Sequence, residues 1–102
     1  MPVTPEQQFQ KALLLLDRGE IERGESILRE VVAAADVSRD ELLSVRSRCC
    51  LGVLLVELDR INEARPLLEF VVEHSVSPDS DDVLDFERQT ARDLLARLTG
   101  GT

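Results

Sequence analysis

Small and apolar residues along this chain recur at steps of three and four, which places them on one face of an α-helix. The stretch 21–35 shows the pattern simply, because charged residues fill most of the positions between its apolar ones. The run from Leu13 to Leu16 makes one apolar face wide and indicates contacts on more than one side. The sequence therefore predicts five helices, over residues 5–17, 21–35, 39–58, 62–75 and 82–98.

Helix starts are also marked in the sequence. Thr4 followed by Gln7 three residues later is a capping box, which predicts the start of the first helix. Ser38 followed by Glu41 has the same form, so we expect Ser38 to cap the third helix. Pro66 is expected in or near the first turn of the fourth helix, where a missing N–H costs little.

Residues 12–32 match residues 52–72 without a gap when the chain is shifted by 40 positions. Large apolar residues coincide along the helix stripe, and small residues coincide at two places. A small residue lets two helix axes approach closely where they cross, because a larger side chain would push the axes apart. Repeats of this length indicate stacked helical hairpins. The predicted crossing residues are Ala12, Gly24, Gly52 and Ala64.

The small residues and the apolar residues that follow them resemble the tetratricopeptide repeat. The resemblance implies an all-α fold, a right-handed stack of antiparallel helical hairpins in one domain over residues 1–102. Two repeats would cover about 5–38 and 39–78, and a capping helix about 80–98. The chain departs from the family in its period, which is longer than the usual roughly 34 residues. Gln8 and Arg48 also stand where the family has a large aromatic residue.

Composition narrows the classes of partner. The chain of 102 residues has a formal charge of −8, which disfavours nucleic acid and anionic membrane surfaces. Its only aromatic residues are three Phe, too few for a base-stacking surface. No apolar run approaches the roughly 20 residues of a membrane helix, and the start lacks the pattern of a secretory signal. The two cysteines are neighbours and cannot easily bridge, so we expect a cytoplasmic location.

In the tetratricopeptide family the first helix of each repeat lines a concave groove, and the resemblance implies a similar groove here. The residues carried over by position from the first and third helices are mainly apolar. Arginines from the third and fifth helices add positive charge. The candidate partner-binding residues are Phe9, Leu13, Leu16, Arg46, Cys49, Val53, Val56, Arg88 and Arg92.

Three occupants of this groove are open at this point. The fifth helix could fold into it, a partner's amphipathic helix or extended segment could fill it, or two copies could bury it as a homodimer. Arg46 and Arg48, together with Arg88 and Arg92, would form a clamp for a partner's carboxylate. Otherwise these arginines pair with surface carboxylates, where each pair contributes little.

The sequence contains few candidate catalytic residues. His74 is the only histidine, and a catalytic dyad would need it beside Cys49 or Cys50. Adjacent cysteines on a helix do not easily face one metal. The acidic residues of 79–85 lack the glycine and the closing glutamate of a calcium loop. We therefore expect a non-enzymatic adaptor or scaffold without cofactor or metal, acting through protein contact. The alternative is a self-associating structural module.

Overall fold

The computed structural model describes residues 3–74 and 82–100. Within these residues the chain forms helices and connecting turns and contains no strand, which confirms the predicted all-α class. The helices are α1 (Pro5–Asp17), α2 (Ile21–Ser38), α3 (Glu41–Glu57), α4 (Ile61–Glu73), the short 3-10 helix η2 (Asp82–Leu84) and α5 (Asp85–Gly100).

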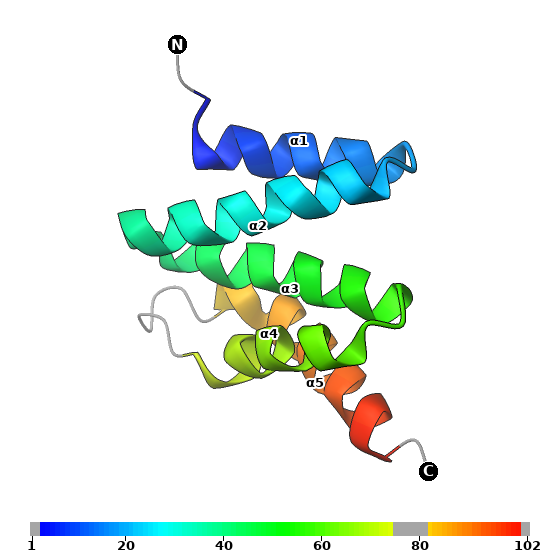
Figure 1. The fold of residues 1–102 in the computed structure, drawn as a ribbon. Helices are drawn as coiled ribbons and strands as arrows, with labels where there is room; N and C mark the ends of the chain where they lie inside the picture. The colour runs from blue at the N-terminus through cyan, green and yellow to red at the C-terminus, as the bar shows by residue number, and fades with distance from the viewer. Residues whose placement is uncertain (1–2, 75–81, 101–102) are drawn as a thin grey trace.

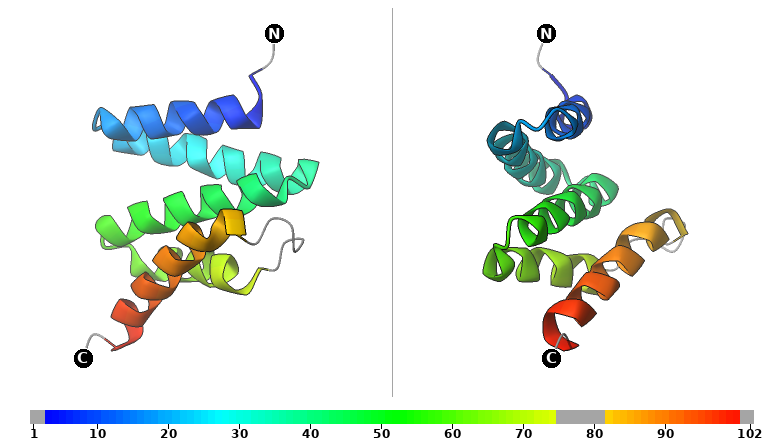
Figure 2. Two further views of the ribbon diagram at one scale, coloured as in Figure 1. Left: turned by 180° about the vertical axis from the view of Figure 1, so that it is seen from behind. Right: turned by 90° about the vertical axis from the view of Figure 1, so that its right-hand side faces the viewer.

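Consecutive helices pack against one another from one end of the molecule to the other (Figure 1). α1 pairs with α2 and α3 with α4, and the contact between α2 and α3 joins the two hairpins. α5 lies across α4 and α3 at the far end, and it passes in front of them in the left panel of Figure 2. The resulting slab measures 50 × 35 × 19 Å.

The predicted crossing residues do permit close helix packing in both hairpins. A Cβ added to Gly24 would lie 2.5 Å from Leu16 Cδ2 and 3.4 Å from the Ala12 carbonyl oxygen. A Cβ added to Gly52 would lie 2.8 Å from Leu68 Cδ2. A Cβ at either position would therefore require Leu16 or Leu68 to shift, which shows how closely the paired helices approach. All four crossing residues are buried: Ala12, Gly24, Gly52 and Ala64.

The first helix begins as predicted. The Gln7 backbone N–H donates to Thr4 Oγ1 at 3.1 Å, and the Thr4 N–H donates to Gln7 Oε1 at 3.0 Å, which completes the capping box. The expectation for Pro66 is wrong, because it lies in the second turn of α4. Its missing N–H leaves the carbonyl of Asn62 without a helical donor, but Asn62 is exposed and water can replace that donor.

The prediction that Ser38 caps the third helix is also wrong. α2 continues to Ser38, whose hydroxyl donates to the Ala35 carbonyl at 3.3 Å. Arg39 then adopts a left-handed conformation with φ 60°, which ends α2. Asp40 caps α3 instead, accepting a hydrogen bond from the Leu43 N–H at 3.1 Å. Because Asp and Ser are both strong caps, the choice depends on where α2 stops.

The other predicted helix ends differ by a few residues. α4 stops at Glu73, and Ser75 lies outside the described residues, as does the predicted loop 76–81. The predicted fifth helix begins with a single 3-10 turn at Asp82–Leu84 before α5 proper.

Candidate functional site

An open groove of about 370 Å³ lies between α1, α3 and α5, the three helices at the front of the left panel of Figure 2. Its lining is mainly apolar and includes four of the predicted residues. Of the other predicted apolar residues, Phe9 is buried in the core and Val56 packs against the core without lining the groove. The lining residues are Leu13, Leu16, Ile21, Cys49, Cys50, Val53, Leu54, Glu57, Phe86 and Thr90.

None of the predicted arginines lines the groove. Arg46 Nε is 3.8 Å from Glu87 Oε2, and the Arg88 guanidinium donates to the His74 carbonyl at 3.4 Å. Arg92 is exposed on α5. Arg46 and Arg88 therefore already contact groups of this chain, which leaves them less suited to clamp a partner's carboxylate.

Sequence reasoning missed the part of the groove that α5 supplies. Phe86 and Thr90 are one helical turn apart and lie on the groove side of α5, and Phe86 is 76% exposed. The pattern assigned this side of the helix to solvent because Phe86 lies off the apolar stripe. The available signal was a large aromatic residue on an otherwise charged helix face. Glu87, on the same helix, faces Arg46 of α3, with its side chain only 18% exposed.

The two cysteines of the groove are protonated thiols at neutral pH. Burial raises the pKa of the Cys49 thiol to about 12, and the neighbouring charges of Cys50 and Glu87 add to the shift. Burial and Glu87 raise the pKa of Cys50 to about 11. Because the thiolate is the reactive form, neither residue is prepared to act as a nucleophile. His74 lines a different pocket, so it does not complete a site with them.

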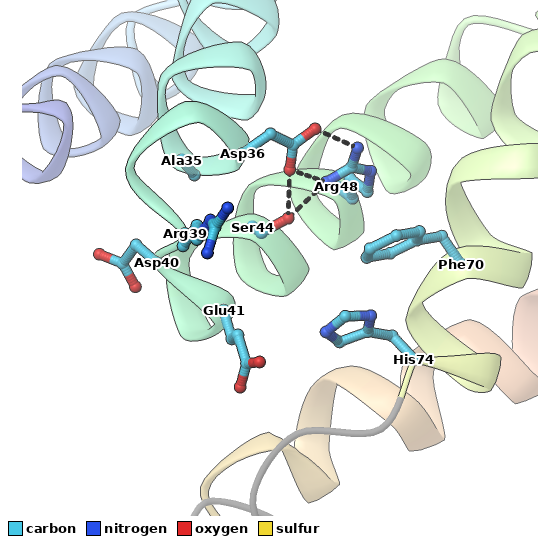
Figure 3. Close-up of a pocket in the computed structure, with 9 residues that line it drawn as sticks. All are labelled: Ala35, Asp36, Arg39, Asp40, Glu41, Ser44, Arg48, Phe70 and His74. Carbon is cyan, nitrogen blue, oxygen red and sulfur yellow. Dashed lines mark hydrogen bonds and ion pairs between the residues drawn. The ribbon is translucent and has the colours of Figure 1, made fainter.

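A second pocket, of about 360 Å³, lies where α2 ends and α3 begins, beside the end of α4 (Figure 3). Arg48 donates to the two oxygens of Asp36 at 2.9 and 2.7 Å, and the Ser44 hydroxyl donates to Asp36 at 2.8 Å. The Arg48 guanidinium lies 4.0 Å from the centre of the Phe70 ring. His74 stacks on the other side of this small cluster, its ring centre 4.7 Å from that of Phe70.

These polar groups mainly satisfy one another. The hydrogen bonds from Arg48 lower the pKa of Asp36 to about 2, so the pair is ionised at neutral pH. Its contribution to stability is present above the ordinary pKa of an aspartate and is lost as the pH falls through about 2. Arg48 thus belongs to a structural contact between α2, α3 and α4, where Asp36 occupies the guanidinium that was suggested for a carboxylate clamp.

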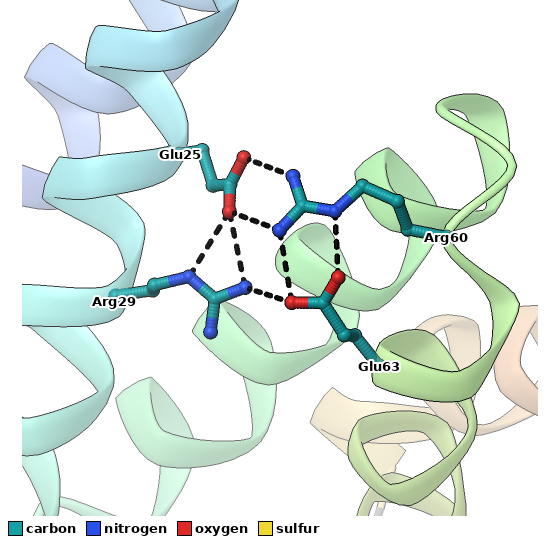
Figure 4. A network of polar contacts seen from close by, with 4 residues as sticks. All are labelled: Glu25, Arg29, Arg60 and Glu63. Atoms are coloured by element: carbon teal, nitrogen blue, oxygen red, sulfur yellow. Dashed lines mark hydrogen bonds and ion pairs between the residues drawn. The ribbon is translucent and has the colours of Figure 1, made fainter.

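A third polar cluster ties the two hairpins together (Figure 4). Arg60, just before α4, donates to both oxygens of Glu25 on α2 at 2.7 and 3.0 Å and to Glu63 at 2.7 Å. Arg29 closes the ring by donating to Glu25 at 3.1 Å and to Glu63 at 3.1 Å. Hydrogen bonds from Arg60 are the main reason that the pKa of Glu25 and that of Glu63 are both lowered. All four charges are paired, which marks this ring as structural.

In the described part of the chain, no three His, Cys, Asp or Glu residues are grouped so that they could hold a metal ion. None of the helices there has both the length and the apolar character to cross a lipid bilayer. Comparisons with protein-family models, with curated proteins and with solved structures find no match to this chain. The lining of the groove between α1, α3 and α5 is therefore the basis for inferring a function.

Proposed function

We propose that this chain is a non-enzymatic protein-interaction module of tetratricopeptide type, an adaptor or scaffold that binds a partner's peptide or amphipathic helix in the groove between α1, α3 and α5. The observation that carries the proposal is Phe86, which is 76% exposed beside an apolar groove that is open to solvent. Exposed apolar surface of this kind is costly in water and is typical of binding sites.

The groove offers the chemistry that an apolar side chain of a partner needs. Leu13 and Leu16 from α1 face Cys49 and Val53 from α3 across it, and Phe86 stands at its edge. A partner helix would place residues one turn apart against such a surface. Large aromatic residues that a partner covers completely often carry much of the binding energy, and a segment seated in the groove would cover Phe86. The protonated thiols of Cys49 and Cys50 contribute apolar surface to the groove.

A second candidate function is self-association, in which two copies bury their grooves against each other. The same exposed Phe86 favours it, because a symmetric dimer would cover both copies of the residue at once. The formal charge of −8 on each copy opposes it. Light scattering over a range of protein concentrations separates the two functions, since a strict monomer at high concentration excludes the dimer.

The test of partner binding compares two exposed apolar residues. Peptides are selected from a phage-displayed library on the immobilised full chain, and their affinities are measured by fluorescence anisotropy. Phe86→Ser should weaken binding of the selected peptides about tenfold or more, as expected for an aromatic residue that the partner buries. Val37→Ser is the matched control, because Val37 is 85% exposed near the C-terminal end of α2 and does not line the groove.

The control variant should bind the selected peptides as the parent chain does. Equal affinities for the parent chain and both variants would place the selected peptides outside the groove and contradict the proposal. Equal losses of peptide affinity in the two variants would mean that the peptides bind exposed apolar residues anywhere on the surface and not a specific groove. Circular dichroism of both variants checks that the helices are intact, which is expected because neither residue is buried.

A further inference from the structure

The groove carries negative charge that the described chain does not neutralise. Glu57 is the last residue of α3, lines the groove and is exposed, and no ion pair forms with it among the described residues. The last turn of α3 contains no basic residue, so the partial negative charge of the helix C-terminus adds to that of Glu57.

Two more carboxylates lie on helices that border the groove, although neither of them lines it. Asp17 ends α1 as Glu57 ends α3, and Figure 1 shows the two helices finishing on the same side of the molecule. Arg18 follows Asp17 and is the one cation next to it. On the α5 side, Glu87 Oε1 is buried and accepts no hydrogen bond within the described residues, while its other oxygen is 3.8 Å from Arg46.

From this arrangement we infer that the groove takes a basic amphipathic segment of another protein, whose apolar residues fill the groove and whose Lys or Arg reaches Glu57. This inference rests on the proposed function and names the class of partner. A Lys or Arg is suited to the place, because its long methylene stem lies along apolar surface while its charged end meets a carboxylate. Complementary charge also accelerates encounter and excludes wrong partners.

Charge also disfavours two other occupants of the groove, a second copy of this chain and a partner's terminal carboxylate. A second copy of this chain brings a formal charge of −8, so its approach to an acidic groove is opposed. A partner's terminal carboxylate would need free arginines, but Arg46 and Arg88 already contact this chain. In the second pocket, the charges of Arg48 and Asp36 are paired with each other.

The experiment uses a phage library with fixed leucine and phenylalanine positions of an amphipathic helix and a random choice of Lys or Glu at the flanking positions. It is selected on the full chain, on Glu57→Lys and on Glu69→Lys. Glu69 is exposed on α4 outside the groove, so its variant makes the same change of net charge at a different place. Lysine at the end of α3 suits the helix dipole, so Glu57→Lys should fold.

We expect the parent chain to enrich Lys over Glu several-fold, Glu69→Lys to keep that preference, and Glu57→Lys to remove or reverse it. High salt should weaken the preference, because exposed charges are screened. Peptides that bind the parent chain, lose affinity for Phe86→Ser and show no preference for Lys would overturn this inference. They would leave the proposed function standing. An equal loss of the Lys preference in Glu57→Lys and Glu69→Lys would mean that the net charge of the chain, and not the position of Glu57, causes the preference. That result would also overturn the inference. A selection without Phe86-dependent peptides would overturn both.

Discussion

Lys11 in the first hairpin and Leu51 in the second occupy the same place in the repeat, 40 residues apart, and have opposite surroundings. Leu51 is 1% exposed in the core, whereas Lys11 lies in solvent. One turn further on, Leu54 is 6% exposed and its equivalent Leu14 is 51% exposed. The difference arises because α2 packs against α3, while no described helix covers the corresponding side of α1.

The comparison separates two kinds of position in a stacked hairpin. Contacts inside a hairpin are needed in both copies, so the crossing residues and the stripe between paired helices are alike. Contacts between hairpins exist only where a neighbour is present, and a polar outer face is what an end repeat needs in water. Lys11 meets this need and Leu14 does not, so α1 keeps an apolar residue on its open side.

The largest expected effect tests this difference directly. Leu51→Ala should lower the free energy of unfolding by about 2–5 kcal/mol, because it removes buried methyl groups and leaves a cavity. Lys11→Ala at the equivalent place should change it by no more than about 0.5 kcal/mol, since it touches no core. Urea denaturation of both variants gives the two values. Similar losses in the two would mean that the first hairpin is covered in solution on the side that is open here.

A smaller effect is expected at the two glycines. An alanine at Gly24 would come closer to its neighbour than one at Gly52, but the neighbour Leu16 borders the open groove and can move. The neighbour of Gly52 is Leu68, which is fully buried and cannot. Alanine also gains about 1 kcal/mol of helix propensity over glycine at either place.

Gly52→Ala should therefore destabilise by about 1–2 kcal/mol, through overpacking that exceeds the propensity gain. Gly24→Ala should stay within about 1 kcal/mol of the parent chain. Thermal melts followed by circular dichroism measure both. A larger loss of stability in Gly24→Ala than in Gly52→Ala would show that the distance to the neighbouring leucine matters more than the freedom of that leucine to move. The two hairpins would then not differ in the way described.

The smallest effect concerns the charges that join the hairpins. Arg60 and Glu63 have the opposite signs to Glu20 and Arg23, their equivalents in the first hairpin, where the pair is 2.7 Å apart. Arg60→Glu should lower the melting temperature, because it sets like charges against Glu25 and Glu63.

Reversing all four charges of the ring should recover most of that loss, because every contact again joins opposite signs. The variant carries four substitutions: Glu25→Arg, Arg29→Glu, Arg60→Glu and Glu63→Arg. Raised salt should reduce the difference between the single variant and the parent chain. A fourfold variant as unstable as Arg60→Glu would mean that side-chain shape, and not the sign of the charge, selects these residues.

The sequence predicted much of the scaffold because its signals are local. Thr4 and Gln7 lie within one turn, so their reciprocal hydrogen bonds depend on few other residues. Gly24 and Gly52 are recognisable because each has a small residue, Ala64 and Ala12 respectively, at the equivalent place 40 positions away. The choice between Ser38 and Asp40 as a cap could not be made in this way, because both residues have suitable chemistry. It depended on how far α2 continues.

The candidate site was harder to predict because it is assembled from distant parts. Leu13 and Val53 could be placed on the groove by the resemblance of their helices to a known repeat. Phe86 could not, since its position depends on the angle at which α5 crosses α3 and α4. Arg48 was misplaced for a related reason: its guanidinium has Asp36 and Phe70 within reach only after the hairpins have stacked.

By itself the sequence determined the helices, the two hairpins and the small residues at which they cross, because helix periodicity and side-chain size act within a few turns of chain. Only the tertiary structure decided which equivalent residues are buried, where α5 lies and which charges find partners. Burial and the ion pairs between hairpins depend on neighbours brought from other helices, as Arg60 is brought to Glu25 from 35 positions away. Two copies of one pattern therefore differ wherever their neighbours do.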